Sequence, residues 1–124
     1  MLIGELAQQA GTSTRTLRYY EQHGLVRARR STNGYRVYDE AELPVVRKIR
    51  TLLESGFDLD EIRPFVTCLR AGNSSGDDCP DSVAVLRRKL DEVDDALIRL
   101  TALRAELDRR LAGVERPTPA CEFA

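Results

Sequence analysis

The chain has 124 residues, of which 31% are charged and 42% hydrophobic, and its formal net charge is −1. This length fits one domain, or one compact head with an appended helix. No apolar run approaches the roughly 20 residues that a membrane-spanning helix needs. Glu5 and Gln8 interrupt the first apolar residues, so no signal peptide is expected. Three widely spaced cysteines do not form a secreted disulfide framework, which favours a cytoplasmic location without a membrane partner.

Positive charge is concentrated in the first part of the chain. Residues 1–50 contain nine Arg or Lys and five Asp or Glu, a net charge of +4, whereas residues 51–124 carry −5. Contacts to phosphate need local cations rather than a basic protein as a whole. The slightly acidic total therefore does not exclude a nucleic-acid partner.

The first two predicted helices are joined by a glycine. The first covers residues 4–10 and ends at Gly11, which suits a left-handed cap, and Thr12 or Ser13 can cap the second helix. The second helix runs to about residue 23. Two helices joined in this way form a helix-turn-helix, whose second helix can lie in the major groove of DNA.

The second helix has one inner and one outer face. Leu17 and Tyr20 share the inner face at a spacing of three residues, so both are expected in the core. His23 is interpreted as the last residue of the helix rather than as a ligand. The outer face carries hydroxyl, guanidinium and phenol groups, and the residues predicted to face DNA are Thr14, Arg15, Arg18 and Tyr19.

Two short strands are predicted next, at residues 25–27 and 35–38. The segment between them contains Arg29 and Arg30 and then turn-forming residues that end in Asn33-Gly34, a pair that tolerates positive φ. A two-stranded ribbon is marginally stable alone, so it must pack on the helices. A basic ribbon beside a helix-turn-helix indicates a wing that contacts DNA.

A second pair of helices follows the wing. The third helix is expected to start at Asp39 as its cap and to stop at Gly56, with Pro44 in its first turn. The fourth follows Asp58, whose spacing to Glu61 matches a capping box. The inward positions predicted on the third helix are Leu43, Val46, Ile49, Leu52 and Leu53.

The last third of the chain is typical of a coiled coil. Residues 71–78 form a predicted flexible linker, and Pro80 suits the first turn of the final helix. Apolar residues then recur at steps of three and four over four heptads, with Arg104 as the exception. A rod of about 30 residues, roughly 45 Å long, cannot bury such a seam against a small head, so a dimer is predicted. The seam consists of Val83, Leu86, Leu90, Val93, Leu97, Leu100, Leu107 and Leu111.

The predicted fold is therefore mainly α, with a two-stranded wing, a second helix pair and a long C-terminal helix in an antiparallel coiled coil. Residues 1–70 are expected to form a winged helix-turn-helix DNA-binding domain and residues 71–80 a linker. Residues 81–112 are expected to be the dimerisation helix and residues 113–124 a tail.

Four segments carry a resemblance to the MerR family of transcription regulators. They lie at residues 3–7, 16–25, 33–38 and 53–62, in order and with family-like spacing. Leu-Arg-Tyr-Tyr-Glu followed by Gly-Leu is specific at this position. The resemblance implies a winged helix-turn-helix, an antiparallel dimer that binds inverted repeats and distorts promoter DNA, and RNA polymerase as a partner.

The same resemblance implies roles for single residues. Arg18 would read a base edge, since a guanidinium can bind guanine O6 and N7 together, while Tyr19 would hold phosphate. Thr14 and Arg15 would lie in or beside the major groove. The wing residues implied to contact the DNA backbone are Asn33, Gly34, Arg36 and Tyr38.

The cysteines are the candidate sensor residues. Metal-sensing relatives place thiols at the start of the dimerisation helix and just after it. The paired tail cysteines of copper and zinc sensors and the four-cysteine cluster that holds iron–sulfur are missing here. In an antiparallel dimer Cys79 would lie near Cys121 of the partner subunit, and Cys68 could join them. Three interpretations stay open: a core Cys68 with two incidental cysteines, a reversible disulfide or other redox or electrophile switch, and a soft metal ion bound by thiolates.

We therefore predict a homodimeric, sequence-specific DNA-binding regulator of transcription and not an enzyme. Its partners would be double-stranded promoter DNA, a second copy of the chain and, by resemblance, RNA polymerase. Within the same family the alternative is an effector-independent repressor or architectural DNA binder. From another class, the alternative is a coiled-coil adaptor whose head is merely structural. The operator, the effector and the choice between activation and repression do not follow from the sequence.

Overall fold

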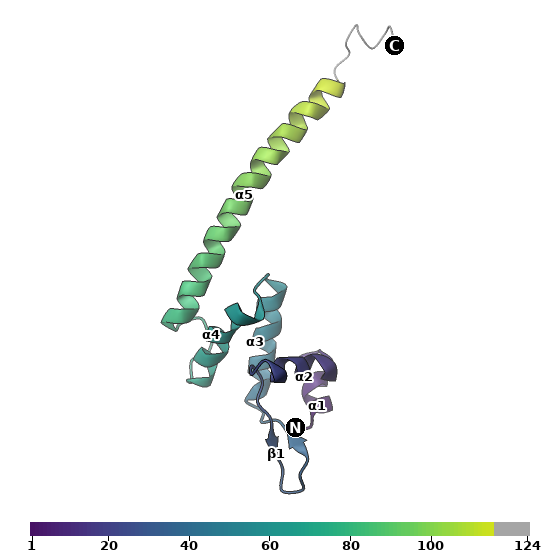
Figure 1. The fold of residues 1–124 in the computed structure, drawn as a ribbon, viewed down its shortest axis with the longest axis vertical. Helices are drawn as coiled ribbons and strands as arrows, with labels where there is room; N and C mark the ends of the chain where they lie inside the picture. Colours follow the sequence, from purple (N-terminus) through teal and green to yellow (C-terminus); the bar gives the residue numbers. More distant parts are fainter. Residues whose placement is uncertain (116–124) are drawn as a thin grey trace. The chain divides into compact units, whose positions relative to one another are not determined.

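The computed structural model describes residues 1–115, which form five helices and a two-stranded antiparallel sheet (Figure 1). The chain divides after Leu86 into two compact units. We call the first unit, Met1–Leu86, the head. The elements are α1 (Ile3–Ala10), α2 (Thr14–Gln22), β1 (Arg29–Arg30), β2 (Arg36–Val37), α3 (Glu42–Glu54), α4 (Leu59–Arg70) and α5 (Pro80–Glu115). The predicted fold class, mainly α with a wing and a long final helix, is confirmed.

The helix-turn-helix forms for the local reasons that the sequence suggests. Gly11 ends α1 in the left-handed region, at φ 70°, which costs a glycine nothing because it has no Cβ. Ser13 then caps α2, because its Oγ accepts a hydrogen bond from the Thr16 backbone N–H at 3.1 Å. His23 is the C-terminal cap residue of α2, as predicted.

The first strand of the wing lies later than predicted. β1 consists of Arg29–Arg30 and pairs with β2, whereas Leu25 and Val26 are buried in the core. The backbone before the wing is engaged elsewhere: the Leu25 N–H donates to the Tyr20 carbonyl and the Arg27 N–H to the Glu42 carboxylate. The prediction of a strand at residues 25–27 is therefore wrong, since these hydrogen bonds fasten the segment to the helices.

The predicted cap of the third helix is also wrong. Helix α3 begins at Glu42 after Ala41, and Asp39 forms an ion pair with Arg29 instead, with 2.8 Å between Oδ1 and Nη2. Helix α4 begins as expected, because Asp58 and Glu61 exchange side-chain-to-backbone hydrogen bonds in a capping box. Pro44 lies in the first turn of α3, as predicted.

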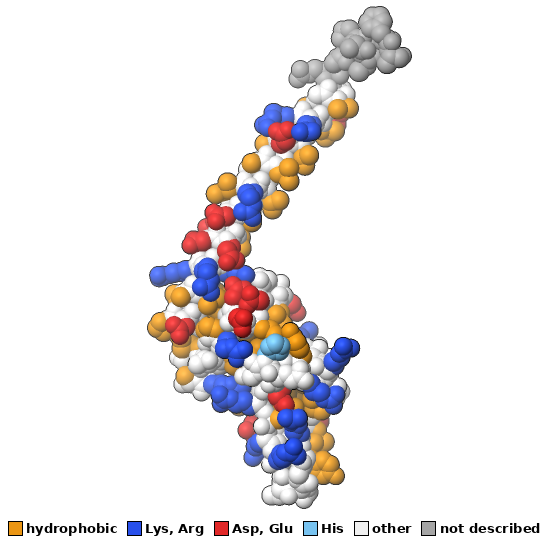
Figure 2. Space-filling model, viewed as in Figure 1, with side chains coloured by type: hydrophobic (Ala, Val, Ile, Leu, Met, Phe, Trp, Pro, Cys, Tyr) orange, Lys and Arg blue, Asp and Glu red, His pale blue; other side chains and the backbone are white. Residues whose placement is uncertain are grey.

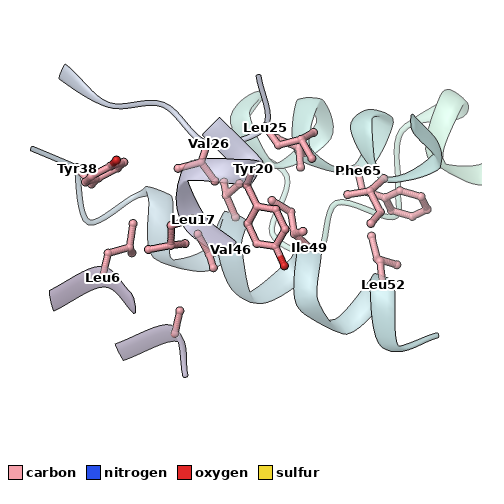
Figure 3. Packing of buried hydrophobic residues seen from close by; sticks show 14 of the residues in the cluster. Leu6, Leu17, Tyr20, Leu25, Val26, Tyr38, Val46, Ile49, Leu52 and Phe65 are labelled. Carbon is pink, nitrogen blue, oxygen red and sulfur yellow. The ribbon is translucent and has the colours of Figure 1, made fainter. Parts of the chain in front are cut away.

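The core of the head is made by one face of each helix from α1 to α4, closed by the chain on either side of the wing (Figure 3). Leu17, Tyr20 and Leu6 come from the first helix pair, and Ile49 and Phe65 from the second. On α3, the predicted core residues Val46, Ile49 and Leu52 are buried, and Leu43 and Leu53 are partly buried. Tyr38 also lies in this core although it follows the second wing strand.

Helix α5 differs in that its large apolar side chains from Leu86 onward are exposed. The seam residues Leu90, Leu97 and Leu107 are between 56% and 61% accessible, and Figure 2 shows hydrophobic side chains in orange along this helix. Arg104 is the one polar residue of the seam. Leu103, directly before it, is three residues after Leu100 and four before Leu107, so it lies on the same side of the helix as both. Within residues 1–115, none of the helices is long and apolar enough to cross a lipid bilayer.

Candidate nucleic-acid interface

The outer face of α2 presents the residues that the sequence singles out for DNA. Arg15, Arg18 and Tyr19 are exposed and Thr14 is half-buried. Leu17 and Tyr20 anchor the opposite face, and burial raises the pKa of the Tyr20 phenol despite the nearby charge of Arg50. The Tyr19 ring leans on His23, with 4.4 Å between ring centroids in an edge-on arrangement. The helix is thus held firmly by its inner side while its cationic side stays open.

Glu21 connects this helix to the wing. Its carboxylate accepts a hydrogen bond from the Tyr38 hydroxyl at 2.7 Å and forms an ion pair with Arg36, also at 2.7 Å. Burial, followed by the hydrogen bond to Glu21, raises the pKa of Tyr38 to about 12. The phenol therefore stays protonated and keeps donating. We call these three side chains the wing clamp.

The wing itself is a short hairpin that projects from the helices (Figure 1). Its tip turns through Gly34 at φ 81°, and the Gly34 N–H donates to the Ser31 carbonyl at 2.9 Å. Asn33, Tyr35 and Arg30 are exposed on it, and Figure 2 shows Lys and Arg side chains over this part of the head. The hairpin therefore presents cationic and aromatic groups without burying them.

A second polar network holds the base of the wing. Glu42, buried in the first turn of α3, accepts two hydrogen bonds from the Arg70 guanidinium, each at 2.8 Å, and one from the Arg27 N–H at 2.7 Å. Arg70 also donates to the Leu25 carbonyl at 2.9 Å. Burial raises the pKa of the Glu42 carboxyl, but the hydrogen bonds and charges of Arg70 and Arg27 outweigh this and leave it below its usual value.

The structure brings most of the predicted DNA-facing residues onto two neighbouring elements of the head, α2 and the wing. Tyr38 is placed differently: it is 1% exposed and its hydroxyl points to Glu21, so its ring lies inside the head and not on the backbone-facing side of the wing. Arg36 is exposed but shares its charge with Glu21. The structure thus places these two residues in the wing clamp.

Sequence reasoning did not identify Glu21, Glu42 or Arg70 as functional positions. Glu21 lies in the motif of the second helix, but nothing along the chain reveals a partner 15 or 17 residues away. The separation of Glu42 and Arg70 is 28 residues, and no spacing rule links them. Glu42 follows Asp39 and Glu40 in the sequence, so nothing in the local composition distinguishes it from its acidic neighbours.

The two cysteines within the described residues form an intramolecular disulfide bond. Cys68, at the end of α4, and Cys79, directly before α5, form a disulfide with 5.8 Å between their Cα atoms. The expectation that Cys68 is buried is confirmed, and its sulfur is bonded to that of Cys79. The predicted meeting with Cys121 of the partner subunit lies outside the described residues.

A metal site would need thiolates, because a sulfur already bonded to sulfur is not a thiolate ligand. Among residues 1–115, no three His, Cys, Asp or Glu side chains gather in a way that could hold a metal ion. In the disulfide form, the described cysteines therefore do not fit a metal centre.

Comparisons with known families agree with this architecture. The description "MerR HTH family regulatory protein" matches residues 1–67, and "MerR, DNA binding" matches residues 45–110. The second match ends near the close of α5, so the two together span the head and most of the long helix.

Two curated relatives and one solved structure illustrate the similarity. The HTH-type transcriptional regulator HmrR of Rhizobium leguminosarum is 32% identical over 87% of this chain and 81% of its own length. The nodulation protein NolA of Bradyrhizobium elkanii is 38% identical over 91% of this chain, which spans only 48% of NolA. The structure of the transcription regulator PbrR691 of Ralstonia metallidurans, in complex with lead(II), is 29% identical with a TM-score of 0.72 and covers 97% of this chain and 92% of that one.

Proposed function

The chain belongs to the MerR HTH family of regulatory proteins, and we propose that it acts as a homodimer that binds an inverted repeat in promoter DNA and distorts it. DNA-binding regulation of transcription is the property common to the family matches and to HmrR. The dimer, the distortion and the residue roles that follow are our proposal. We also place it in the cytoplasm, with RNA polymerase as a partner on the promoter.

The wing clamp is the observation that carries this proposal. Arg18 and Arg15 project from α2, and Glu21 on the same helix holds Tyr38 and Arg36 at the end of the wing. A reading helix and a wing that share one carboxylate can approach a duplex as one surface. In this arrangement Arg18 contacts a base edge in the major groove. Thr14, Arg15 and Tyr19 contact the sugar–phosphate backbone on either side of the groove.

The wing would contact the sugar–phosphate backbone beside that groove. Asn33 and the Gly34 backbone lie at its tip, where the absence of a Cβ leaves open space for a phosphate. Arg36 supplies charge from the clamp, and Tyr38 positions the wing from inside the head without touching DNA. These contacts would add affinity and fix the register but carry little sequence information.

The exposed seam of α5 supports the homodimer. Seam residues between 37% and 61% exposed recur at steps of three and four from Leu86 to Leu111, and a groove of about 380 Å³ runs between Leu100, Leu107 and Leu111. A helix of this pattern is stable in water when a matching helix covers the seam. A second copy matches it by symmetry, and two heads would then face two halves of an inverted repeat.

Selection from a random duplex library tests the proposal. The full chain should enrich an inverted repeat and should sediment as a dimer at micromolar concentration. Arg18→Ala should weaken binding to the selected duplex by roughly 1–3 kcal/mol, about 5-fold to 150-fold, because a bidentate base contact is lost. Arg99→Ala removes the same charge from an exposed position on α5, outside the seam, and should bind as the unmodified chain does.

Three results would contradict the proposal. Equal affinities for the two variants would remove Arg18 from the base-reading role. A stable dimer that enriches no duplex would favour the coiled-coil adaptor instead. Distortion is tested separately by energy transfer between dyes at the two ends of the selected duplex, and an unchanged end-to-end distance on binding would reject it.

A further inference from the structure

We propose that Cys68 and Cys79 are a reversible dithiol–disulfide pair, opened and closed by cellular oxidants and reductants, that fastens the first turn of α5 to the end of α4. The regulatory part of this inference, a change in DNA binding, rests on the proposed function. The existence of the pair does not.

The position of the bond is the first step. Cys68 is in the last turns of α4, and the Cys79 carbonyl accepts the first backbone hydrogen bond of α5, from the Val83 N–H at 3.0 Å. The bond thus joins the end of one helix directly to the start of the next. Ser82 and Val85, in the first turns of α5, are buried with it in the head. A restraint here acts on the same helix that carries the exposed seam.

The loop between the two cysteines holds them together without help from the bond. Asp77 forms an ion pair with Lys48 of α3 at 2.8 Å, and the Asn73 side chain donates to the Cys68 carbonyl at 3.2 Å. Gly76 lies so close to α4 that a Cβ there would stand 2.9 Å from the Phe65 carbonyl oxygen. The segment predicted as a flexible linker is therefore fastened to the helices, so the two sulfurs stay near each other after reduction.

The two sulfurs differ in access. Cys68 is 1% exposed, whereas Cys79 is half-buried. Both cysteines line a surface groove of about 360 Å³ together with Arg63, Thr67 and Asp81. A small oxidant or thiol can reach Cys79 through this groove. The Asn73 amide N–H lies 3.3 Å from the Cys79 sulfur, and the start of α5 adds its partial positive charge. Both stabilise negative charge on the Cys79 sulfur, whereas the carboxylates of Asp60 and Asp81 in the same groove oppose it. Access through the groove therefore makes Cys79 the sulfur that reacts first.

The chemistry balances with a peroxide as the oxidant. The Cys79 thiolate attacks the peroxide, breaks its O–O bond and becomes a sulfenic acid, with one water released after proton uptake. The Cys68 thiol then attacks that sulfur and expels a second water, so two thiols and one hydrogen peroxide give one disulfide and two waters. A cellular dithiol reverses the reaction: its thiolate attacks Cys79, Cys68 leaves as the thiolate, and the reductant closes its own disulfide.

Opening the pair removes a covalent restraint from the start of α5. The amide hydrogens of the first two turns of that helix should then exchange faster, because only the non-covalent contacts of the loop still hold the helix start. In a dimer joined through α5, this change would alter how firmly each head is held, and hence its affinity for an inverted repeat. The reduced thiols, unlike the disulfide, would also be free to bind soft electrophiles.

Thiol counting on the full chain tests the pair. Hydrogen peroxide should remove two alkylatable thiols, dithiothreitol should restore them, and digestion of the oxidised protein should yield a peptide that links Cys68 to Cys79. Cys121→Ser is the matched control and should behave identically. Cys79→Ser should not form this link, and Cys68→Ala checks the result with a core-compatible side chain. A linked peptide that contains Cys121, or no loss of thiols, would overturn the proposal.

Hydrogen exchange and DNA binding complete the experiment. Oxidation should slow exchange across residues 80–86 in the unmodified chain and in Cys121→Ser, and should shift affinity for the selected duplex by at least about fivefold. Neither change should occur in Cys79→Ser. A pair that cycles with unchanged exchange and affinity would overturn the regulatory inference. Failure of both redox forms to bind any duplex would instead refute the proposed function, while the thiol and exchange measurements still decide the pair.

Discussion

The head and the part of α5 beyond Leu86 differ in whether their large apolar side chains are buried. In the head, Leu6, Leu17 and Ile49 are completely buried, whereas on the distal helix Leu97 and Leu107 are each 56% exposed. The head completes its core from within one chain, because four short helices turn their apolar faces toward one another. Along the described part of the distal helix, up to residue 115, the large apolar side chains are exposed. Apolar side chains in a regular repeat that one chain leaves uncovered are the surface that the proposed homodimer would bury.

A charged residue in the seam of α5 should weaken the proposed dimer, and this is the largest effect that we expect. Leu97→Asp should weaken self-association by about 3–6 kcal/mol, because two copies of a buried leucine are lost in a symmetric dimer. The dissociation constant from sedimentation equilibrium should rise roughly 100-fold or more. Ile98→Asp, one residue away and off the seam, is the matched control and should leave that constant unchanged.

The stability of the head should depend on the side chains that fill its core. Phe65→Ala should lower the free energy of unfolding by about 3–5 kcal/mol, because the cavity that it leaves cannot collapse fully. Ile98→Ala on α5 should change it by no more than about 0.5 kcal/mol. Urea denaturation at two protein concentrations separates these effects from dissociation. Similar losses in both variants would erase the distinction between the two regions.

The ion pairs of the two regions also differ in burial. The pair of Glu42 and Arg70 in the head is buried, whereas ion pairs on the distal helix, such as Arg110 with Glu106, are exposed. Arg70→Met should cost roughly 2–4 kcal/mol at neutral pH, because Glu42 loses its charged partner in a buried position. Arg110→Met, the matched control, should cost less than about 1 kcal/mol.

The effect of Arg70→Met should also depend on pH with a definite sign. The pKa of Glu42 is lowered in the folded protein, so its contribution is present above the ordinary value of 4.5 and is lost as the pH falls through the folded value. The difference in unfolding free energy between Arg70→Met and the unmodified chain should therefore shrink in acid. A difference that stays constant between pH 7 and pH 3 would contradict the role of this carboxylate.

The wing clamp gives the smallest expected effect on stability. Tyr38→Phe removes one hydrogen bond to a carboxylate and should cost about 1–2 kcal/mol. Because the pKa of Tyr38 is raised from 10.0 to about 12, its contribution is complete below pH 10 and is lost as the pH rises through 12. Ultraviolet titration should show a phenol that ionises near pH 12. Tyr38→Phe should lack this phase and Tyr35→Phe, at the exposed wing tip, should retain it.

Local rules along the chain predicted much of this protein correctly. Gly11, Ser13 and the Asp58–Glu61 box set helix ends through contacts within three or four residues, and such contacts can be read from spacing. The three-and-four repeat likewise predicted the long helix and the exposed residues on it. The fold class and the cationic face of α2 followed from these patterns and from the family motifs.

The contacts between distant residues could not be predicted in this way. The first wing strand was placed too early because Leu25 and Val26 have the character of a strand, yet the core and the Glu42 network engage them first. The family resemblance implies a DNA contact for Tyr38, but its ring is buried and its hydroxyl donates to Glu21. The linker was expected to be free, and Asp77 and Gly76 fasten it to the helices.

The order of residues alone thus established the helix boundaries set by local caps, the repeat along α5 and the family to which the chain is similar. Three features depended on the folded chain: which carboxylate holds the wing, where its first strand begins, and that Cys68 reaches Cys79. The reason is that hydrogen bonds, ion pairs and disulfides between segments depend on where the backbone returns in space. That return is determined by the packing of the whole core and not by any one stretch of residues.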